Sequence, residues 1–325
     1  MQRKLPNLIL TLAALILAAC ATASTATAIP TEIPPPTLTT APEAVPATIT
    51  LTDGRGAEVT LQAPAARIIS MAPSNTELLF AVGAGAQIVG RDSFSDFPAD
   101  ALNITDIGGG WGELDLETIL TLEADLVLSA DIIAPEQNQA LEDLGLTVFV
   151  LPNPVDFDGL YQNMETVAAL TGRTAEAAVA IDALKLRVEA ALQTVSAAET
   201  TPLVFYQLDS TDPAAPWTSG PGTFIDTLIT LAGGRNVGSV LDGAWVQISS
   251  EALIAQNPDV ILMGDAIYSG LTPEDVAARP GWDIIAAVQN GRVFAFDDNL
   301  VSRPGPRLVD GLETLARLLH PELFE

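Results

Sequence analysis

The chain has 325 residues, and 14 lysine and arginine side chains against 41 aspartate and glutamate side chains give it a net charge of −27. This balance argues against nucleic acid as a partner, because contacts to phosphate groups need clustered cations. The single histidine, His320, and the single cysteine, Cys20, largely exclude disulfide scaffolds, cysteine-rich zinc sites and cysteine–histidine catalysis. The length allows two domains of moderate size.

The first twenty residues have the pattern of an export signal. Arg3 and Lys4 precede an apolar run from Leu8 to Ala19, which is shorter than the about 20 residues that a membrane-spanning helix needs. The run ends in Leu-Ala-Ala-Cys20, which is similar to the lipobox of bacterial lipoproteins, in which the cysteine is lipidated after cleavage. The resemblance implies an extracytoplasmic protein anchored to a membrane through Cys20; a cysteine in an ordinary secretory signal is the alternative.

A stretch rich in alanine, threonine and proline follows. Residues 21–47 contain 20 residues of these three types and show no apolar period. Such a composition cannot bury a core and favours extended or polyproline conformations, which reach up to about 80 Å at about 3.1 Å per residue. We therefore expect a tether here, with the folded part beginning near Ala47.

The strongest feature of the sequence is an internal repeat. Residues 111–128 and 245–262 align without a gap at an offset of 134 across eighteen positions. The shared residues are Trp111 and Trp245, Glu117 and Glu251, Asp125 and Asp259, and Leu128 and Leu262. In each copy a good N-cap residue, Asp115 or Ser249, precedes a glutamate in the first helical turn, where the helix dipole favours a carboxylate. A short helix and then a buried strand are expected in both copies.

Strand and helix patterns alternate around this repeat. Residues 67–70 and 203–206 predict opening strands, and residues 148–150 and 293–295 predict closing strands. Each opening strand is followed by a helix that ends at glycines, and Ser74-Asn-Thr-Glu77 predicts a capping box for the first of these helices. The alternation predicts an α/β protein with two Rossmann-like lobes, each built on a mostly parallel sheet.

A single long helix is expected to join the two lobes. Residues 157–170 predict one helix, Thr171-Gly-Arg173 interrupts it, and residues 174–193 contain neither proline nor glycine. This second helix would be about 30 Å long. The expected organisation is a signal peptide with a lipobox at 1–20, a tether at 21–47, an N-terminal lobe at 48–154, linking helices at 155–196 and a C-terminal lobe at 197–325.

Two α/β lobes on a tethered lipoprotein resemble the substrate-binding proteins of ABC importers for cobalamin and iron complexes. The resemblance covers about residues 48–325 of the chain. It rests on Arg67 to Phe80, Ser95-Asp-Phe-Pro98, Ala215-Pro-Trp-Thr-Ser-Gly220 and Arg303-Pro-Gly-Pro-Arg307. It implies a monomer that is not an enzyme and has no resident cofactor or metal. Such a protein captures a metal chelate in the cleft between its lobes and delivers it to the permease subunits of an importer.

The resemblance also implies that aromatic side chains hold the ligand. The residues that match the family's ligand-contacting aromatics are Phe97, Trp111, Trp217 and Trp245. Such rings can stack on a flat macrocycle, whereas the alternative is ordinary packing beneath loops. We favour packing for Trp282. The cobalamin binder of the family has a further tryptophan where this chain has about Ala130.

Glu117 and Glu251 match the paired glutamates with which the family docks onto arginines of the transporter's membrane subunits. A charge at such an interface steers and orients docking more than it adds affinity. The alternative is that both glutamates only complement the helix dipole, which is worth about 0.3–1 kcal/mol.

Several charged or polar residues stand out in so acidic a chain. The arginines are Arg91, Arg235, Arg303 and Arg307. They can pair bidentately with carboxylates of an anionic ligand, whereas internal salt bridges are the alternative, which we favour for Arg307. Tyr206 and Tyr268 have the phenol that ligates haem iron in some proteins, but half-buried packing is the commoner role. His320 is expected to end the last helix.

Cobalamin is the expected ligand, because loop aromatics prevail and basic residues do not cluster. A ferric siderophore ranks second through the arginines, and haem ranks third. The rival class is a cell-surface hydrolase with paired carboxylates, but the sequence has no nucleophile elbow, serine–histidine pair or metal-binding motif. A solely structural or signalling lipoprotein would leave the repeated tryptophans without a role.

Overall fold

The computed structural model of the protein describes residues 48–110 and 112–324. The expected signal peptide, the lipidation site at Cys20, the tether and Trp111 lie outside the described residues. Residues from 48 onward belong to one compact unit. Within the described ranges, no helix is both long and apolar enough to cross a bilayer.

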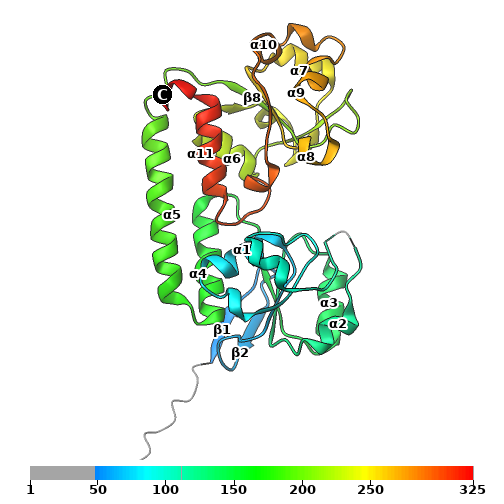
Figure 1. Ribbon diagram of the computed structural model, residues 1–325, viewed down its shortest axis with the longest axis vertical. Helices are drawn as coiled ribbons and strands as arrows, with labels where there is room; N and C mark the ends of the chain where they lie inside the picture. Colours follow the sequence, from blue (N-terminus) through cyan, green and yellow to red (C-terminus); the bar gives the residue numbers. More distant parts are fainter. Residues whose placement is uncertain (1–47, 111, 325) are drawn as a thin grey trace, which may run out of the picture. The chain divides into compact units, whose positions relative to one another are not determined.

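A five-stranded parallel sheet forms the centre of the N-terminal lobe (Figure 1). Its strands are β3 (Ile68–Ser70), β4 (Ile88–Arg91), β5 (Thr105–Asp106), β6 (Leu126–Ala130) and β7 (Val148–Leu151), in the order β5-β4-β3-β6-β7. The lobe's helices are α1 (Pro73–Ala81), α2 (Leu116–Thr121) and α3 (Pro135–Asp143). An antiparallel hairpin of β1 (Ile49–Thr52) and β2 (Glu58–Leu61) precedes them. Every residue of β3, β6 and β7 is buried, as expected for parallel strands covered on both faces.

A four-stranded parallel sheet forms the centre of the C-terminal lobe. Its strands are β8 (Leu203–Gln207), β10 (Arg235–Asn236), β12 (Val260–Met263) and β13 (Val293–Ala295), in the order β10-β8-β12-β13. The lobe also has an antiparallel pair, β9 (Trp217–Ser219) and β11 (Trp245–Gln247). Its helices are α6 (Phe224–Leu231), α7 (Ser250–Gln256), α8 (Ala266–Ser269), α9 (Pro273–Ala277), α10 (Ala286–Gln289) and α11 (Leu308–Leu319). The expectation of two α/β lobes with mostly parallel sheets is confirmed.

The internal repeat gives both lobes the same strand order. The order β4-β3-β6-β7 in one lobe corresponds to β10-β8-β12-β13 in the other. The repeated aspartates also have the same structural role. Asp125 accepts backbone N–H bonds from Ala66 and Arg67 at 2.8 and 3.0 Å, and Asp259 accepts one from Leu203 at 2.7 Å. Each carboxylate thus ties the segment after the short helix to the start of the lobe's first strand.

Two helices, α4 (Phe157–Thr171) and α5 (Thr174–Val195), join the lobes (Figure 1). Gly172 between them has a φ of 71°, the left-handed conformation that favours glycine. The long helix α5 packs against α4 and against α11, where Arg187 binds Asp310 and Glu313 at 2.5 and 2.9 Å. The expected pair of helices and the break between them are confirmed. We propose the lobe boundaries expected from the sequence, because each parallel sheet lies within one of those ranges.

One continuous apolar core runs through both lobes and the linking helices. It includes Ile68 and Leu78 of the N-terminal lobe, Leu160 and Ile181 of the linking helices, and Leu228 of the C-terminal lobe. Each lobe has one further apolar cluster, which lies on the opposite face of its parallel sheet. The lobes are therefore joined by packing along the side on which α4, α5 and α11 lie.

A buried ion pair also connects the two lobes. Glu77 of α1 is only 3% exposed, and its carboxylate accepts two hydrogen bonds, at 2.6 and 3.0 Å, from Arg307 at the start of α11. Burial raises the pKa of Glu77, and the guanidinium group of Arg307 offsets part of this rise. The expected capping box was wrong: α1 begins at Pro73 with Ala72 as its N-cap and no side-chain cap. The carboxylate of Glu77 instead binds Arg307, which lies 230 residues away in the chain.

Glu77→Gln should lower the free energy of unfolding by about 2–4 kcal/mol, because it leaves the Arg307 cation without its counter-charge in a buried site. A matched control is Glu176→Gln, which breaks the exposed pair between Arg173 and Glu176 at 3.3 Å and should cost less than about 0.5 kcal/mol. Urea denaturation of the two variants measures both values. Equal costs would show that the buried pair does not hold the lobes together.

Candidate functional site

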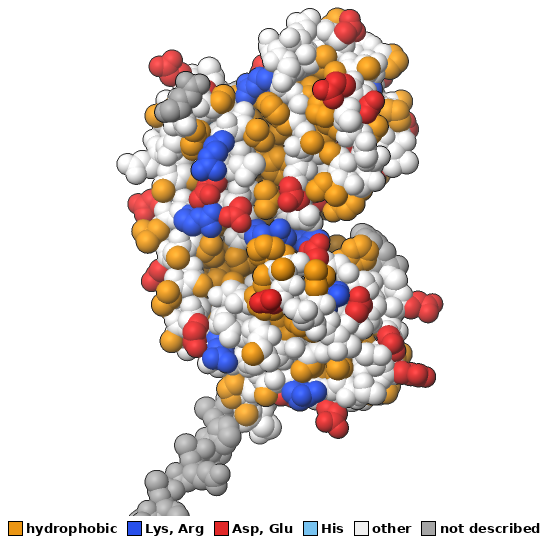
Figure 2. All heavy atoms as spheres, in the orientation of Figure 1, with side chains coloured by type: hydrophobic (Ala, Val, Ile, Leu, Met, Phe, Trp, Pro, Cys, Tyr) orange, Lys and Arg blue, Asp and Glu red, His pale blue; other side chains and the backbone are white. Residues whose placement is uncertain are grey.

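A cavity of about 720 Å³ lies between the two lobes. The N-terminal lobe contributes residues 71–75, 130–133 and 151–154, which follow the carboxyl ends of β3, β6 and β7. The C-terminal lobe contributes Leu208 after β8, together with Trp245, Tyr268 and the segment Ser302 to Pro304. Figure 2 shows the notch between the lobes, with hydrophobic side chains on its rim and basic side chains at its inner end. Open α/β sheets bind ligands at this end of their strands.

Several large side chains that line this cavity are partly exposed. Phe94, Ile132, Trp245 and Tyr268 are 46%, 76%, 49% and 70% exposed, respectively. Apolar and aromatic side chains that remain exposed in a concave site are typical of ligand pockets, because a ligand can bury them. The arrangement suits a ligand with a broad apolar face.

The four aromatic residues expected to bind ligand have different positions. Trp245 of β11 lines the cavity. Trp217, on the neighbouring strand β9, is 39% exposed but does not line it. Phe97 lies beneath the guanidinium group of Arg307, 4.2 Å from the ring centre, and also lies outside the cavity. Trp111 lies outside the described residues, although its chain neighbour Gly110 is part of the cavity wall.

The four arginines that stood out in the sequence also have different positions relative to the cavity. Arg303 lines the cavity and binds Asp96 of the opposite lobe at 2.5 Å. Arg91 is buried, where it donates to the carbonyl groups of Ala101 and Asp92 and lies 3.4 Å from Asp106. Arg307 makes the internal salt bridge that we favoured from the sequence. Arg235 of β10 is exposed and does not line the cavity.

A buried carboxylate, Asp92, forms part of the cavity wall beside Phe94. Its oxygens accept hydrogen bonds from the backbone N–H of Phe94, at 2.9 Å, and from the hydroxyl of Ser95. The hydroxyl of Ser95 continues in a hydrogen-bonded row with Thr76 and Ser70 at 2.8 Å each. Burial raises the pKa of Asp92, although the bond from Ser95 acts in the opposite direction.

A second buried carboxylate, Asp298, shapes the loop that carries Arg303. It accepts hydrogen bonds from the phenol of Tyr206, at 2.5 Å, and from the hydroxyl of Ser302. Burial raises the pKa of Asp298, and these two bonds lower it in part. Tyr206 is fully buried against this carboxylate, so of the two tyrosines only Tyr268 faces the cavity.

The two glutamates expected to dock on a transporter occupy equivalent positions. Glu117 and Glu251 are exposed in the first turns of α2 and α7. The expected N-caps are present: Asp115 accepts from the N–H of Thr118 at 3.0 Å, and Ser249 accepts from that of Ala252 at 3.2 Å. Neither glutamate forms an ion pair with any residue of the described ranges, so both are available to a partner.

Two further residues have the structural roles expected of them. Trp282 is completely buried, packs against the ring of Phe205 and donates its indole N–H to Ser250 at 2.7 Å. His320 ends α11 and is also completely buried.

The residues of the cavity wall that the sequence reasoning missed include Asp92, Phe94, Ile132 and Asp131. Phe94 and Asp92 precede the matched Ser-Asp-Phe-Pro stretch, so their position next to a family motif was a usable signal. Ile132 and Asp131 follow the carboxyl end of β6, where the strand-end rule alone could have indicated them.

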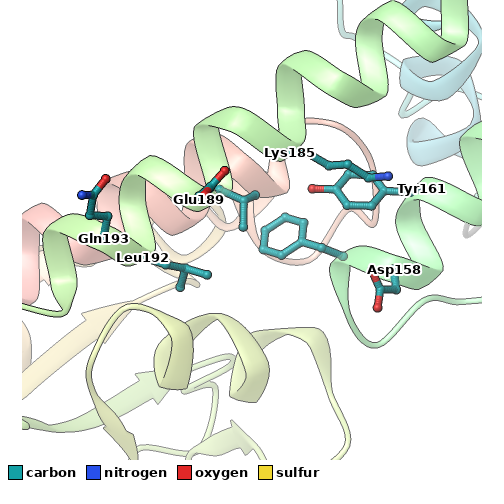
Figure 3. Close-up of a pocket in the computed structure, with 8 residues that line it drawn as sticks. Asp158, Tyr161, Lys185, Glu189, Leu192 and Gln193 are labelled. Carbon is teal, nitrogen blue, oxygen red and sulfur yellow. The ribbon is translucent and has the colours of Figure 1, made fainter.

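A second hollow, of about 660 Å³, lies between α4 and α5 (Figure 3). Tyr161 and Asp158 line it from α4, and Lys185 and Glu189 from α5, with the Lys185 ammonium nitrogen 5.1 Å from the Tyr161 ring centre. It contains none of the residues expected to bind ligand. The cleft between the lobes is therefore the candidate ligand site, and the fold with its cleft defines a two-lobed solute-binding protein.

Comparisons with known proteins agree with this class. Residues 68–300 match the family described as periplasmic binding protein. The chain is 30% identical to the uncharacterized ABC transporter substrate-binding lipoprotein YvrC of Bacillus subtilis, over 85% of this chain and 87% of that protein. It is 28% identical to the cobalamin-binding protein of Halobacterium salinarum, over 84% and 74%. The solved structure of the periplasmic heme-binding protein RhuT from Roseiflexus sp. RS-1 matches with a TM-score of 0.71 and 26% identity, over 79% and 98%.

The chain therefore belongs to the periplasmic binding protein family. It is a solute-binding protein that works outside the cytoplasm and not an enzyme, so the hydrolase alternative falls away. Within residues 48–110 and 112–324, no group of three or more histidine, cysteine or carboxylate residues is placed to hold a metal ion.

The pKa of Asp298 is raised in the folded protein, so its contribution to stability is present below the ordinary carboxyl pKa and is lost as pH rises through the raised value. The stability of the wild type relative to Asp298→Asn should therefore be greater at about pH 4 than at about pH 7. Denaturant titrations at both pH values measure this difference.

Asp115→Asn is a control for which stability should change with pH in the opposite direction. Hydrogen bonds from Thr118 lower the pKa of Asp115, so its contribution is lost as pH falls. If both variants changed in the same direction with pH, the assigned environment of Asp298 would be incorrect.

Proposed function

We propose that the protein captures a metal chelate, with cobalamin as the leading candidate, in the cleft between its lobes and delivers it to an ABC importer. The observation that carries this proposal is the cavity of about 720 Å³ walled by Phe94, Ile132, Trp245 and Tyr268. A corrin ring is broad and largely apolar on its faces, and such side chains gain by covering it.

The charges near the cavity favour cobalamin over a highly anionic chelate. Binding several anionic groups requires a cluster of free cations. Arg303 is the one arginine of the described residues that lines the cavity, and it is already bound to Asp96. A ferric siderophore held by several arginines, the second candidate from the sequence, therefore has less support.

Haem is the remaining alternative, and one observation favours it. Tyr268 lines the cavity and is 70% exposed, so its phenol is available as an oxygen ligand for iron. The similarity to a heme-binding protein is in line with this alternative. Titration with both cyanocobalamin and haemin separates the two candidates, because tyrosine ligation of iron has its own visible absorption spectrum.

The proposal extends to the anchor and the transporter. A lipid on Cys20, followed by the tether at residues 21–47, would hold the folded part near the membrane that contains the importer. Glu117 on one lobe and Glu251 on the other would meet arginines of the two permease subunits. A local supply of loaded protein would then raise the effective concentration at the importer.

Trp245→Ala should raise the Kd for the bound chelate about 10- to 100-fold, because it removes a large aromatic surface from the cavity wall. Ile284→Ala is the matched control, since Ile284 is an exposed apolar residue of the same lobe that does not line the cavity. Intrinsic fluorescence titration with cyanocobalamin, haemin and a ferric-siderophore panel gives the affinities. Trp217→Ala is measured alongside, and it should change the Kd less than Trp245→Ala does.

If Trp245→Ala left every affinity unchanged, the cleft would not be the ligand site. If the wild type did not bind cyanocobalamin but bound another chelate tightly, the assignment of cobalamin as the ligand would be wrong. The assignment of the cleft as the ligand site would still hold.

The double variant Glu117→Ala/Glu251→Ala should reduce ligand uptake by the importer at least about tenfold while leaving the Kd for the ligand unchanged, because interface charges act on docking. The matched control is Glu136→Ala/Glu274→Ala, which removes exposed acids from the first turns of α3 and α9. Uptake is measured in proteoliposomes that contain the cognate transporter. Equal losses in the two double variants would indicate a general effect of charge and not a docking role.

A further inference from the structure

We propose that Asp92 is a specificity-determining residue, which makes the cavity favour chelates that present N–H donors, such as carboxamides, over chelates that present carboxylates. The proposal rests on the function proposed above, since it concerns the same cleft. It names the chemistry that one wall of the cleft recognises.

The carboxylate of Asp92 has an incomplete set of hydrogen-bond partners. Asp92 is 1% exposed and lies at the cavity wall, yet it forms no ion pair with any residue that the structure describes. An ionised carboxyl group has about four acceptor positions, and the structure fills them only with the N–H of Phe94 and the hydroxyl of Ser95. Burial raises the pKa of Asp92, and the charges of Arg303 and Arg91 offset this only in part, without forming an ion pair with it. A further N–H donor from a ligand in the cavity would therefore stabilise this carboxylate.

The arginines near Asp92 already have other carboxylates as partners. Arg91 lies 3.4 Å from Asp106 and donates to backbone carbonyl groups, and Arg303 binds Asp96 at 2.5 Å. The third arginine of this region, Arg307, is committed to Glu77. Arg303 and Arg91 act on Asp92 only at a distance, and each already has another carboxylate as its ion-pair partner, so neither can pair with an incoming anion without leaving that partner.

Negative charge prevails around the cavity. Carboxylates outnumber arginines among the charged residues that line it or interact with those lining it. The carboxylates are Glu77, Asp92, Asp96, Asp131, Asp297 and Asp298, and the arginines are Arg91 and Arg303. A ligand carboxylate placed against Asp92 would therefore meet a region of the same sign.

Corrin side chains end in carboxamides, whereas haem carries two propionates. The wall formed by Asp92 therefore distinguishes between the two ring systems without contacting the metal. A carboxamide can donate its N–H to the carboxylate of Asp92, and a propionate at the same place cannot. Discrimination by a buried polar group that one ligand satisfies and another leaves unpaired is a strong form of specificity.

The test uses cyanocobalamin and its b-, d- and e-monocarboxylic acids, each of which replaces one propionamide by a carboxylate of nearly the same shape. In the wild type at least one acid should bind about tenfold or more weakly than cyanocobalamin, because two like charges would lie close together in a partly desolvated site. The penalty should differ among the three acids, since Asp92 acts locally. The net charge of −27 would instead penalise all three similarly.

The variant Asp92→Asn should reduce the largest of these penalties to within about threefold, because it removes the charge and keeps the shape. The matched control is Asp100→Asn, an exposed carboxylate of the same lobe that does not line the cavity and whose charge water screens, which should leave the penalty unchanged. Thermal unfolding checks that both variants are folded, and Asp92→Ser is a second variant that keeps a hydroxyl acceptor for the N–H of Phe94. The comparison of the three acids in the wild type needs no variant.

Equal affinity of the wild type for cyanocobalamin and all three acids would overturn the proposal, and so would an unchanged penalty in Asp92→Asn. If cyanocobalamin does not bind, the cobalamin assignment fails separately. Asp92 is then tested with neutral ferrichrome and anionic ferric enterobactin, where the wild type should prefer the neutral chelate and Asp92→Asn should narrow the difference. Absence of binding for every chelate would overturn both proposals.

Discussion

The geometry of the cleft depends on how the two lobes are held together along one side. A continuous apolar core passes from the N-terminal lobe through α4 and α5 to the C-terminal lobe. Beside it, the buried carboxylate of Glu77 holds Arg307 from a position 230 residues away in the chain. Displacing one lobe would separate two charges in a region of low dielectric, where an unpaired charge is costly. The walls of the cavity therefore have defined positions before a ligand arrives.

Features that depend on local patterns could be predicted from the sequence. The apolar runs gave the parallel strands, the break at residues 171–173 gave the turn at Gly172, and the N-caps at Asp115 and Ser249 follow from their places in the repeat. These features are decided by residues within a few positions of one another, so a single sequence contains the information.

Features that depend on contacts between the lobes could not be predicted in the same way. Glu77 fits the spacing of a capping box, but the backbone before α1 places Ala72 at the N-cap and leaves Glu77 to face Arg307. Phe97 and Trp217 occupy motif positions, and yet one packs under a guanidinium group and the other stands one strand away from the cavity wall. Which side of a loop faces the cleft is set by tertiary packing, which has no local period.

The repeat preserves the role of some residue pairs and not of others. Positions that tie strands together are kept in both copies, such as Asp125 and Asp259. A few residues further on, the same offset of 134 joins Asp131 to Asp265. Asp265 is buried and accepts hydrogen bonds from Gln207 and Ser210, whereas Asp131 is exposed at the cavity wall. The two copies thus place the same residue type in different surroundings, so the repeat alone does not decide which of its residues reach the cavity.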